Sequence, residues 1–159
     1  MREKDSLIKD YHNGIVKKSI TINASKEKVW KKISNIIELE WLEGIKIVKL
    51  ISSKKQGIGA IRELEFQDGS IIKEFIVGWK NNEYFSYIAV SGLPLRGYHA
   101  TISLTLKNEK SIMVTWKSYF NSDKMTRKQF TEFYSFIGLF YVKSLNTLKT
   151  SLELSLIHI

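Results

Sequence analysis

Two charged residues, Arg62 and Glu74, sit inside stretches of the chain that are otherwise apolar and strand-like. A buried arginine–carboxylate pair can orient a carbonyl, carboxylate or hydroxyl group of a bound apolar molecule, and the carboxylate can serve as a general base. The same two residues can also form a cross-strand ion pair that satisfies itself and does no chemistry. The sequence leaves both interpretations open, and Glu74 and Arg62 are the candidate catalytic residues.

Several other kinds of chemistry are not expected from this sequence. It contains no cysteine, which removes disulfides, thiol catalysis, cysteine-ligated zinc and iron–sulfur clusters. Its three histidines, His12, His99 and His158, are scattered, and no HExxH motif or carboxylate cluster has metal-ligand spacing. No G-x-S-x-G motif, P-loop or dinucleotide-binding glycine pattern is present. We therefore expect neither a metal nor a bound cofactor.

Length and composition indicate one folded domain. The chain has 159 residues, of which 43% are hydrophobic and 12% aromatic, enough to build a core and to exclude intrinsic disorder. Its 25 basic residues against 16 acidic ones give a formal charge of +9. This excess favours weak association with anionic surfaces. It does not indicate specific nucleic-acid binding, because arginines and exposed aromatic residues are few.

Targeting and membrane signals are also missing from the sequence. The charged start, Met1-Arg-Glu-Lys-Asp5, lacks the apolar region of a signal peptide. The longest strongly apolar run, 133–142, is much shorter than the roughly 20 residues of a membrane span. We therefore expect a soluble, cytoplasmic protein. The extra apolar width of that run also hints at a homodimer contact.

The first part of the chain reads as a strand followed by short helices. Residues 1–14 resemble a polar lead-in, and 15–23 have a strand pattern. Ser25 is a suitable N-cap for a short helix. A second short helical turn is expected from about Ile36 to Trp41.

Six further strands and one long helix are expected in the rest of the chain. The strands are predicted near 45–52, 60–67, 71–79, 84–91, 98–107 and 111–120. From Thr126 onward, apolar residues recur at spacings of three and four, which is typical of a long amphipathic helix. Strands grouped apart from the long helix predict an α+β fold. Residues 15–154 then form a single domain, and 155–159 a tail.

Charged side chains predict the register of one hairpin. If Gln67-Asp-Gly69 forms a three-residue loop, Arg62 faces Glu74 and Glu63 faces Lys73. A two-residue loop would instead place Glu63 opposite Glu74. Because directly opposed unlike charges contribute roughly 0.2–1 kcal/mol per pair and like charges cost free energy, we predict the three-residue loop.

The next turn, Asn81-Asn82, is predicted to have two residues, which pairs Tyr87 with Ile76 and Phe85 with Gly78. The C-terminal helix must cover the mostly apolar face of the sheet that results. On this register, that face carries Arg62, Leu64, Phe66, Ile72, Glu74, Ile76, Phe85, Tyr87 and Ala89. Small residues on that face, namely Gly78, Ala89, Ala100 and Ser118, leave room for a ligand, although large side chains there could equally form an ordinary core. From the sheet, the expected ligand contacts are Arg62, Glu74, Ile76, Tyr87, Tyr98, Ala100, Trp116 and Ser118. From the helix, they are Phe133, Ile137, Phe140, Tyr141 and Ser144.

Several strings, taken in order, resemble the Bet v-type/START (SRPBCC) superfamily, and most closely its polyketide cyclase/dehydrase and lipid-transport branch. They are Ile22-Asn-Ala-Ser-Lys-Glu-Lys-Val-Trp30, Gly59-Ala-Ile-Arg-Glu-Leu64, Asp68-Gly-Ser-Ile-Ile-Lys-Glu74, Leu93-Pro94 followed by Tyr98, Val114-Thr-Trp116, and Leu145-Asn-Thr-Leu-Lys149. The likeness spans roughly residues 15–154. Together, the order and spacing of these motifs are fairly specific for the fold.

The resemblance implies a helix-grip fold, in which a curved seven-stranded antiparallel sheet wraps round a long C-terminal helix, with two short helices after the first strand. It implies an apolar cavity that binds or carries a small hydrophobic ligand, such as a lipid, a sterol or a polyketide-like molecule. By analogy with the plant abscisic-acid receptors, Lys46, Glu74 and Tyr98 lie where a ligand's polar end is contacted. Two alternatives remain: a polyketide cyclase/dehydratase with Glu74 as general base, and a non-catalytic interaction module that docks through lysine-rich faces.

Overall fold

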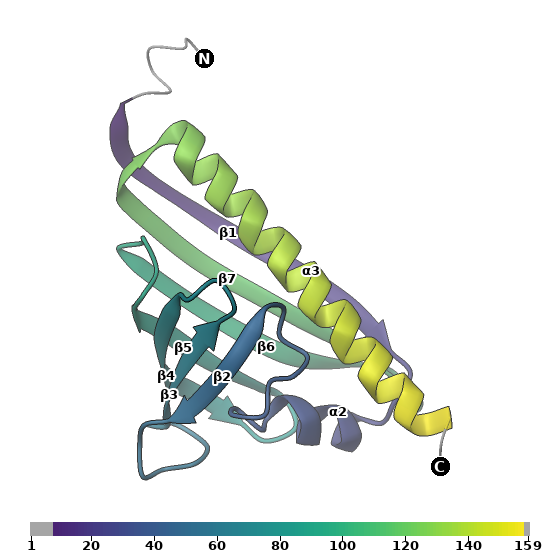
Figure 1. Ribbon diagram of the computed structural model, residues 1–159. Coiled ribbons are helices and arrows are strands. Elements are labelled where there is room, and N and C mark those ends of the chain that lie inside the picture. The colour runs from purple at the N-terminus through teal and green to yellow at the C-terminus, as the bar shows by residue number, and fades with distance from the viewer. Residues whose placement is uncertain (1–7, 158–159) are drawn as a thin grey trace.

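A single antiparallel sheet curves around one long helix in the computed structural model, which describes residues 8–157 and their side chains up to residue 154 (Figure 1). The seven strands lie in the order β1-β7-β6-β5-β4-β3-β2. The elements are β1 (Lys9–Ile22), α2 (Lys26–Ile33), β2 (Ile45–Leu50), β3 (Ile61–Phe66), β4 (Ile71–Lys80), β5 (Tyr84–Ser91), β6 (Gly97–Asn108), β7 (Ser111–Thr126) and α3 (Arg127–Ile157). The predicted α+β helix-grip fold is confirmed.

The first and last strands are longer than the sequence predicted. β1 begins at Lys9 rather than Ile15, so part of the expected polar lead-in is strand. β7 continues to Thr126, and its far end pairs with Lys9. The added length of each strand is stabilised by the other, because the two strands exchange backbone hydrogen bonds there. α3 likewise continues to Ile157, into the predicted tail. His158, which was also expected in that tail, lies outside the described residues.

The first short helix forms as predicted, but the second does not. Ser25 caps α2, since its hydroxyl accepts a hydrogen bond from the backbone N–H of Lys28 at 3.2 Å. Residues 36–44 form only bends and turns. The backbone carbonyl of Ile36 accepts a hydrogen bond from Arg62, and the side chain of Asn35 accepts one from the N–H of Glu38. These bonds compete with the helical pattern that the prediction required.

The predicted register of the β3–β4 hairpin is confirmed. Arg62 faces Glu74 and Glu63 faces Lys73, with Gly69 in the left-handed region at a φ of 87°. That backbone conformation favours glycine because a side chain there is strained. The opposed charges therefore identified the correct loop length.

The predicted register of the β4–β5 hairpin is only partly right. Tyr87 faces Ile76, but Gly78 faces Ser86 rather than Phe85. The turn holds three residues instead of two, with the N–H of Glu83 bonded to the carbonyl of Lys80, and a bulge after Ile76 absorbs the extra residue. Because a bulge shifts the alternation of side chains, Gly78 lies against Ser86 rather than on the face predicted for it.

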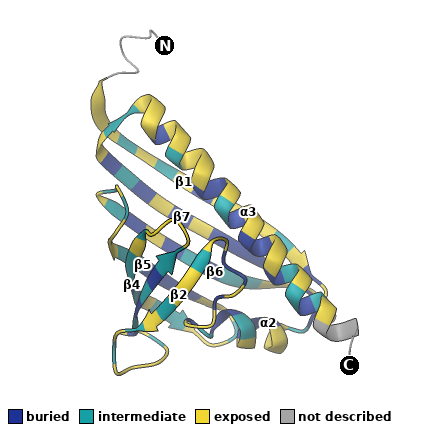
Figure 2. Ribbon diagram, viewed as in Figure 1, coloured by how far each residue is buried: buried dark blue, intermediate teal, exposed yellow. Residues whose placement is uncertain are grey.

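α3 covers the apolar face of the sheet and is buried mainly on the side turned toward the strands (Figure 2). The ring of Tyr141 stacks on that of Trp116 with 3.9 Å between centroids. Gly138 allows close packing, because a Cβ there would lie 3.3 Å from the Cε of Lys18. The other side of the apolar run remains exposed at Phe136 and Leu139. In the part of the chain that the structure describes, no helix is long and apolar enough to cross a membrane.

Candidate functional site

β3 and β4 bring Arg62 and Glu74 together beneath α3. The Nε of Arg62 donates to Oε1 of Glu74 at 3.0 Å, and Nη2 lies 2.9 Å from the same oxygen. The Nη1 group donates to the backbone carbonyl of Ile36 at 2.9 Å. The two side chains are only 5% and 9% exposed. The sequence-predicted pair is thus a buried ion pair, and the turn after α2 completes it.

Burial makes Glu74 easier to protonate than an exposed glutamate. Desolvation of the charged form raises the pKa of its carboxyl, and the charge and hydrogen bonds of Arg62 oppose this shift. The guanidinium of Arg62 also lies 5.2 Å from the centre of the Tyr87 ring, within the range of a cation–π interaction. The site therefore holds a cation fixed by hydrogen bonds beside a carboxyl group whose pKa is raised by burial.

A chain of aromatic polar groups lies next to this pair. The indole N–H of Trp116 donates to the hydroxyl of Tyr87 at 3.1 Å, that hydroxyl lies 3.5 Å from the hydroxyl of Tyr98, and Tyr98 in turn bonds the hydroxyl of Tyr141. Burial is the main cause that raises the pKa of each of these tyrosines far above its ordinary value. Their hydroxyls therefore stay neutral and can both donate and accept hydrogen bonds.

The ion pair faces a small internal space, here called the inner cavity, with a volume of about 50 Å³. One water molecule takes up about 30 Å³ in the liquid, so this space is too small for a lipid or a sterol. Its wall contains Leu39, Trp41, Leu42, Arg62, Leu64, Phe66, Ile72, Glu74, Phe85, Tyr87, Leu93, Tyr98, Ile102, Trp116, Ile137 and Phe140. The wall is almost entirely apolar, apart from the ion pair and the aromatic polar groups.

A larger open pocket, here called the vestibule, adjoins the inner cavity and has a volume of about 490 Å³. It lies between the β3–β4 turn, the loop around Leu93 and the middle of α3. Its wall contains Glu43, Gly44, Phe66, Gln67, Asp68, Ser70, Ile72, Gly92, Leu93, Pro94, Phe133, Phe136, Ile137, Leu139, Phe140 and Lys143. This volume is within the roughly 300–1,000 Å³ of small-molecule sites.

Five side chains belong to the walls of both spaces, and we call them the partition. They are Phe66, Ile72, Leu93, Ile137 and Phe140. The rings of Phe66 and Phe140 meet edge to face at 5.9 Å between centroids. The partition therefore lies between the vestibule and the inner cavity, and all five of its side chains are apolar.

The structure divides the sequence-predicted ligand contacts into three groups. In the wall of the inner cavity lie Arg62, Glu74, Tyr87, Tyr98, Trp116, Ile137 and Phe140. Phe133 lies in the vestibule. Packed in the core, outside both walls, are Ile76, Ala100, Ser118 and Tyr141.

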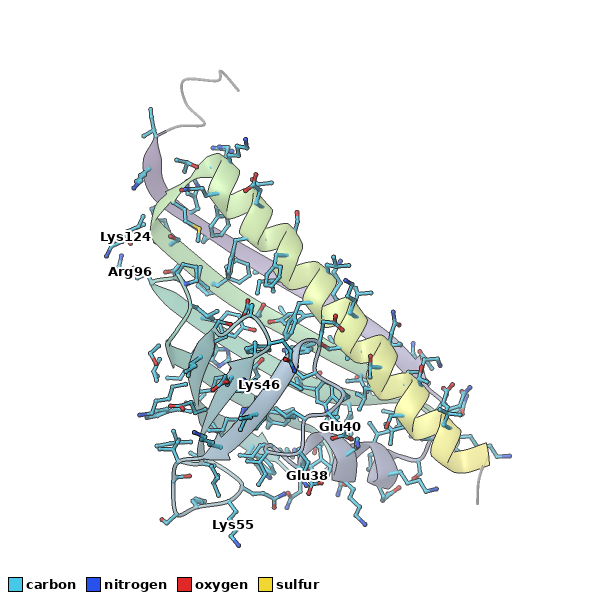
Figure 3. All side chains as sticks on the ribbon, in the orientation of Figure 1. Glu38, Glu40, Lys46, Lys55, Arg96 and Lys124 are labelled. Carbon is cyan, nitrogen blue, oxygen red and sulfur yellow. The ribbon has the colours of Figure 1, made fainter. Side chains whose placement is uncertain are left out.

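Two predicted contacts, Lys46 and Ser144, lie away from both spaces. Lys46 is exposed and forms an ion pair with Glu65 at 3.3 Å (Figure 3). The analogy that suggested Lys46 took no account of the bulge between Ile45 and Ile47, where this residue lies. The hydroxyl of Ser144 accepts a hydrogen bond from the backbone N–H of Glu43 at 3.0 Å, so it fastens the turn before β2 to α3.

Sequence reasoning missed the residues that close the inner cavity from its sides. Leu39, Trp41 and Leu42 come from the turns before β2, where no strand or helix periodicity marks an inward side chain. Leu93 comes from the loop between β5 and β6. The inward alternation of β3 and β4 already indicated Leu64 and Ile72, but only as members of an apolar face.

Metal coordination finds no support among residues 8–157, where no group of three histidine or acidic side chains is placed to hold an ion. In the wall of the inner cavity, the polar groups that could contact a ligand are Arg62, Glu74 and the hydroxyls of Tyr87 and Tyr98.

Comparison with known proteins gave one family match. The family described as polyketide cyclase/dehydrase and lipid transport matches residues 14–153. No curated protein sequence matches the chain.

Several solved structures share the fold at low sequence identity. XoxI from Bacillus cereus is 23% identical, with a TM-score of 0.76 over 87% of this chain and 95% of that one. The ZhuI aromatase/cyclase from Streptomyces sp. R1128 is 12% identical, with a TM-score of 0.75 over 89% and 94%. Norcoclaurine synthase from Thalictrum flavum, in complex with dopamine and hydroxybenzaldehyde, is 14% identical, with a TM-score of 0.70 over 100% and 94%. These likenesses show the fold alone.

Proposed function

Because the chain belongs to the polyketide cyclase/dehydrase and lipid transport family, we propose that it binds a small hydrophobic ligand between the sheet and α3. One observation carries the proposal: an open apolar vestibule adjoins a buried cavity whose wall holds a single ion pair, Arg62–Glu74. Apolar surface supplies affinity at such a site, and a few fixed polar groups supply orientation. A lipid, a sterol or a polyketide-like molecule has the required chemistry.

The ligand's apolar body occupies the vestibule, and its polar end reaches the ion pair once the partition has moved. Oε2 of Glu74 accepts from, or donates to, a ligand oxygen according to the protonation state of the carboxyl. The hydroxyl of Tyr98, which lines the same cavity, offers a second hydrogen bond. The volume of the inner cavity, about 50 Å³, fits a single oxygen-bearing group rather than a whole ligand.

A second candidate function is cofactor-free cyclisation or dehydration of a polyketide-like substrate. The raised pKa of Glu74 favours it, because a general base works best with a pKa near the working pH. Glu74 would take a proton from the carbon beside a carbonyl group, and Arg62 or Tyr98 would stabilise the enolate that forms. The same groups serve both candidates, so turnover alone separates them.

Native mass spectrometry tests ligand binding directly. The purified protein is measured before and after a delipidating wash, and then with a mixed panel of fatty acids, sterols and aromatic polyketides. We expect a retained mass, or selective uptake of one class. A protein that stays free of ligand with every panel member would contradict the proposal.

A further inference from the structure

β7 extends beyond its neighbour β6 and leaves one of its edges open. Pairing between the two strands starts at Gly97 and Asn121, and the N–H of Arg96 makes the last hydrogen bond, to the carbonyl of Asn121. Beyond this point Ser122, Met125 and Thr126 pair with β1, on the opposite side, and residues 123 and 124 lie in a register shift. Figure 1 shows β1 and β7 running past the end of β6. Within residues 8–157, no strand occupies this second side of 122–126.

This open edge lies in a groove of about 760 Å³ that is separate from the inner cavity. Residues 93–96 form one wall, the first turns of α3 form the other, and 122–125 line it between them. An unpaired strand edge binds another extended chain through its free N–H and C=O groups. Within 122–126, the N–H of Lys124 donates to the hydroxyl of Ser122 at 3.3 Å and that of Thr126 to Oε1 of Gln129 at 2.9 Å. An added strand therefore depends on the N–H groups of Asp123 and Met125 and on the carbonyls of the segment. Five strand residues cover about 17 Å, enough for a short peptide strand.

The side chains of the groove indicate what kind of chain it suits. Leu95, Met125 and Phe133 are partly buried apolar residues within it. An added strand presents every second side chain to the same face, so apolar residues at alternate positions would contact them.

The charge around the groove favours acidic residues at the positions of the added strand that lie between its apolar ones. Arg96 and Lys124 are exposed at this end of the molecule, and neither has an ion-pair partner among the described residues (Figure 3). Two acidic residues, Asp123 and Glu132, also line the groove. The charges that line the groove are therefore balanced, and the basic excess at this end of the molecule comes from Arg127 and Lys128, which are exposed at the start of α3.

We propose that the open edge of β7 at residues 122–126 is a docking site for an extended segment of a partner protein, in which apolar residues alternate with acidic ones. The segment adds to the sheet as a strand where β6 has ended. It gains backbone hydrogen bonds from the edge, apolar contacts from the groove, and charge pairing with Arg96 and Lys124.

Selection from a display library of random eight-residue peptides tests this proposal on the full chain. The decisive variant is Asp123→Pro, which removes a backbone N–H in the open segment. Residue 123 lies in the register shift between the pairs His12–Ser122 and Asp10–Met125, so no registered pair with β1 is lost. Circular dichroism and the thermal midpoint verify that the variant is folded. We expect alternating acidic and apolar sequences to be enriched on the unmodified protein and not on Asp123→Pro.

The best peptide is then measured against two double variants of equal charge. Arg96→Glu with Lys124→Glu should weaken binding about tenfold, as two lost rim charge contacts imply. Lys107→Glu with Lys110→Glu changes the net charge equally on exposed residues outside the groove and should have less than about a threefold effect. Hydrogen exchange should show new protection at residues 123 and 125.

Three results would overturn the proposal. One is that no peptide sequence is enriched, and another is that enriched peptides bind Asp123→Pro unchanged. The third is a dimer of the protein that Asp123→Pro abolishes, because the edge would then serve a second copy of the chain.

Discussion

Two nitrogens of Arg62 converge on one oxygen of Glu74: Nε and Nη2 both contact Oε1, at 3.0 and 2.9 Å. No hydrogen bond among the described residues involves the second oxygen, Oε2, although the residue lines the inner cavity. A self-contained structural ion pair would be expected to use both oxygens in a two-pronged contact. The one-sided contact leaves an acceptor for a ligand.

Replacing Arg62 by methionine should strongly destabilise the protein. The change leaves the carboxylate of Glu74 buried without its partner, which typically costs about 3–5 kcal/mol in the free energy of unfolding. Urea denaturation measures this cost. The double variant Arg62→Met with Glu74→Leu is the control and should recover most of the loss. A single variant as stable as the original protein would mean that Glu74 is not charged in the folded state.

Glu74 should also give stability a particular pH dependence. Its carboxyl has a raised pKa when folded, so between the ordinary value of 4.5 and the folded pKa the native state holds a proton that the unfolded chain has released. The resulting stabilisation is fully present below 4.5 and is lost as the pH rises through the folded pKa. Relative to Glu74→Gln, the original protein should therefore lose stability as the pH rises above 4.5, measured by urea denaturation at each pH. A constant difference between the two proteins would refute the raised pKa.

The loop that carries Leu93 depends on a glycine that closely approaches β4. A Cβ on Gly92 would lie 2.0 Å from the backbone oxygen of Ile71, and its φ of 98° is in the left-handed region. Gly69 is a matched control, because it has a φ of 87° and no atom within 4 Å of an added Cβ. Gly69→Ala should cost about 1 kcal/mol for the backbone alone.

Gly92→Ala should cost about 1–3 kcal/mol more than this control, because the methyl group also forces the loop away from β4. Thermal unfolding of both variants provides the comparison. Equal costs would show that the close approach contributes nothing beyond the backbone conformation.

Catalysis makes a separate prediction about Glu74. If the site acts as a cyclase or dehydratase, Glu74→Gln should abolish most turnover while retaining ligand affinity, because the amide keeps the shape but cannot take up the proton. A turnover assay and a binding titration with the same polyketide-like compound measure the two properties. Unchanged turnover in Glu74→Gln would remove the enzymatic role.

Local charge and periodicity predicted the parts of the fold that depend on neighbouring residues. The Arg62–Glu74 register followed from opposed charges on a short hairpin, and the cap at Ser25 followed from the residue type. The long helix was equally predictable from its apolar spacing. These features could be predicted because each depends on a few residues that are close in the sequence.

Prediction from local charge and periodicity failed at bulges and turns. The bulge after Ile76 moved Gly78 to the other face of the sheet. One inserted residue reverses the facing of every residue beyond it, yet leaves no periodic signal of its own. The turn with Trp41 was missed as a cavity wall for a similar reason, since residues 36–44 carry no periodic signal. A residue distant in the sequence, Arg62, contacts this segment by donating to the carbonyl of Ile36.

Isoleucine methyl NMR during titration with a panel compound that the protein retains is the most direct test of the ligand site. The inner cavity contains Ile102, and the partition contains Ile72 and Ile137, whereas Ile22 and Ile112 are buried outside both walls. We predict that the methyl signals of the first three shift together as ligand is added, while the two control signals stay in place. Shifts that spare Ile102 and the partition, or no shift with any panel compound, would contradict a ligand site between the sheet and α3.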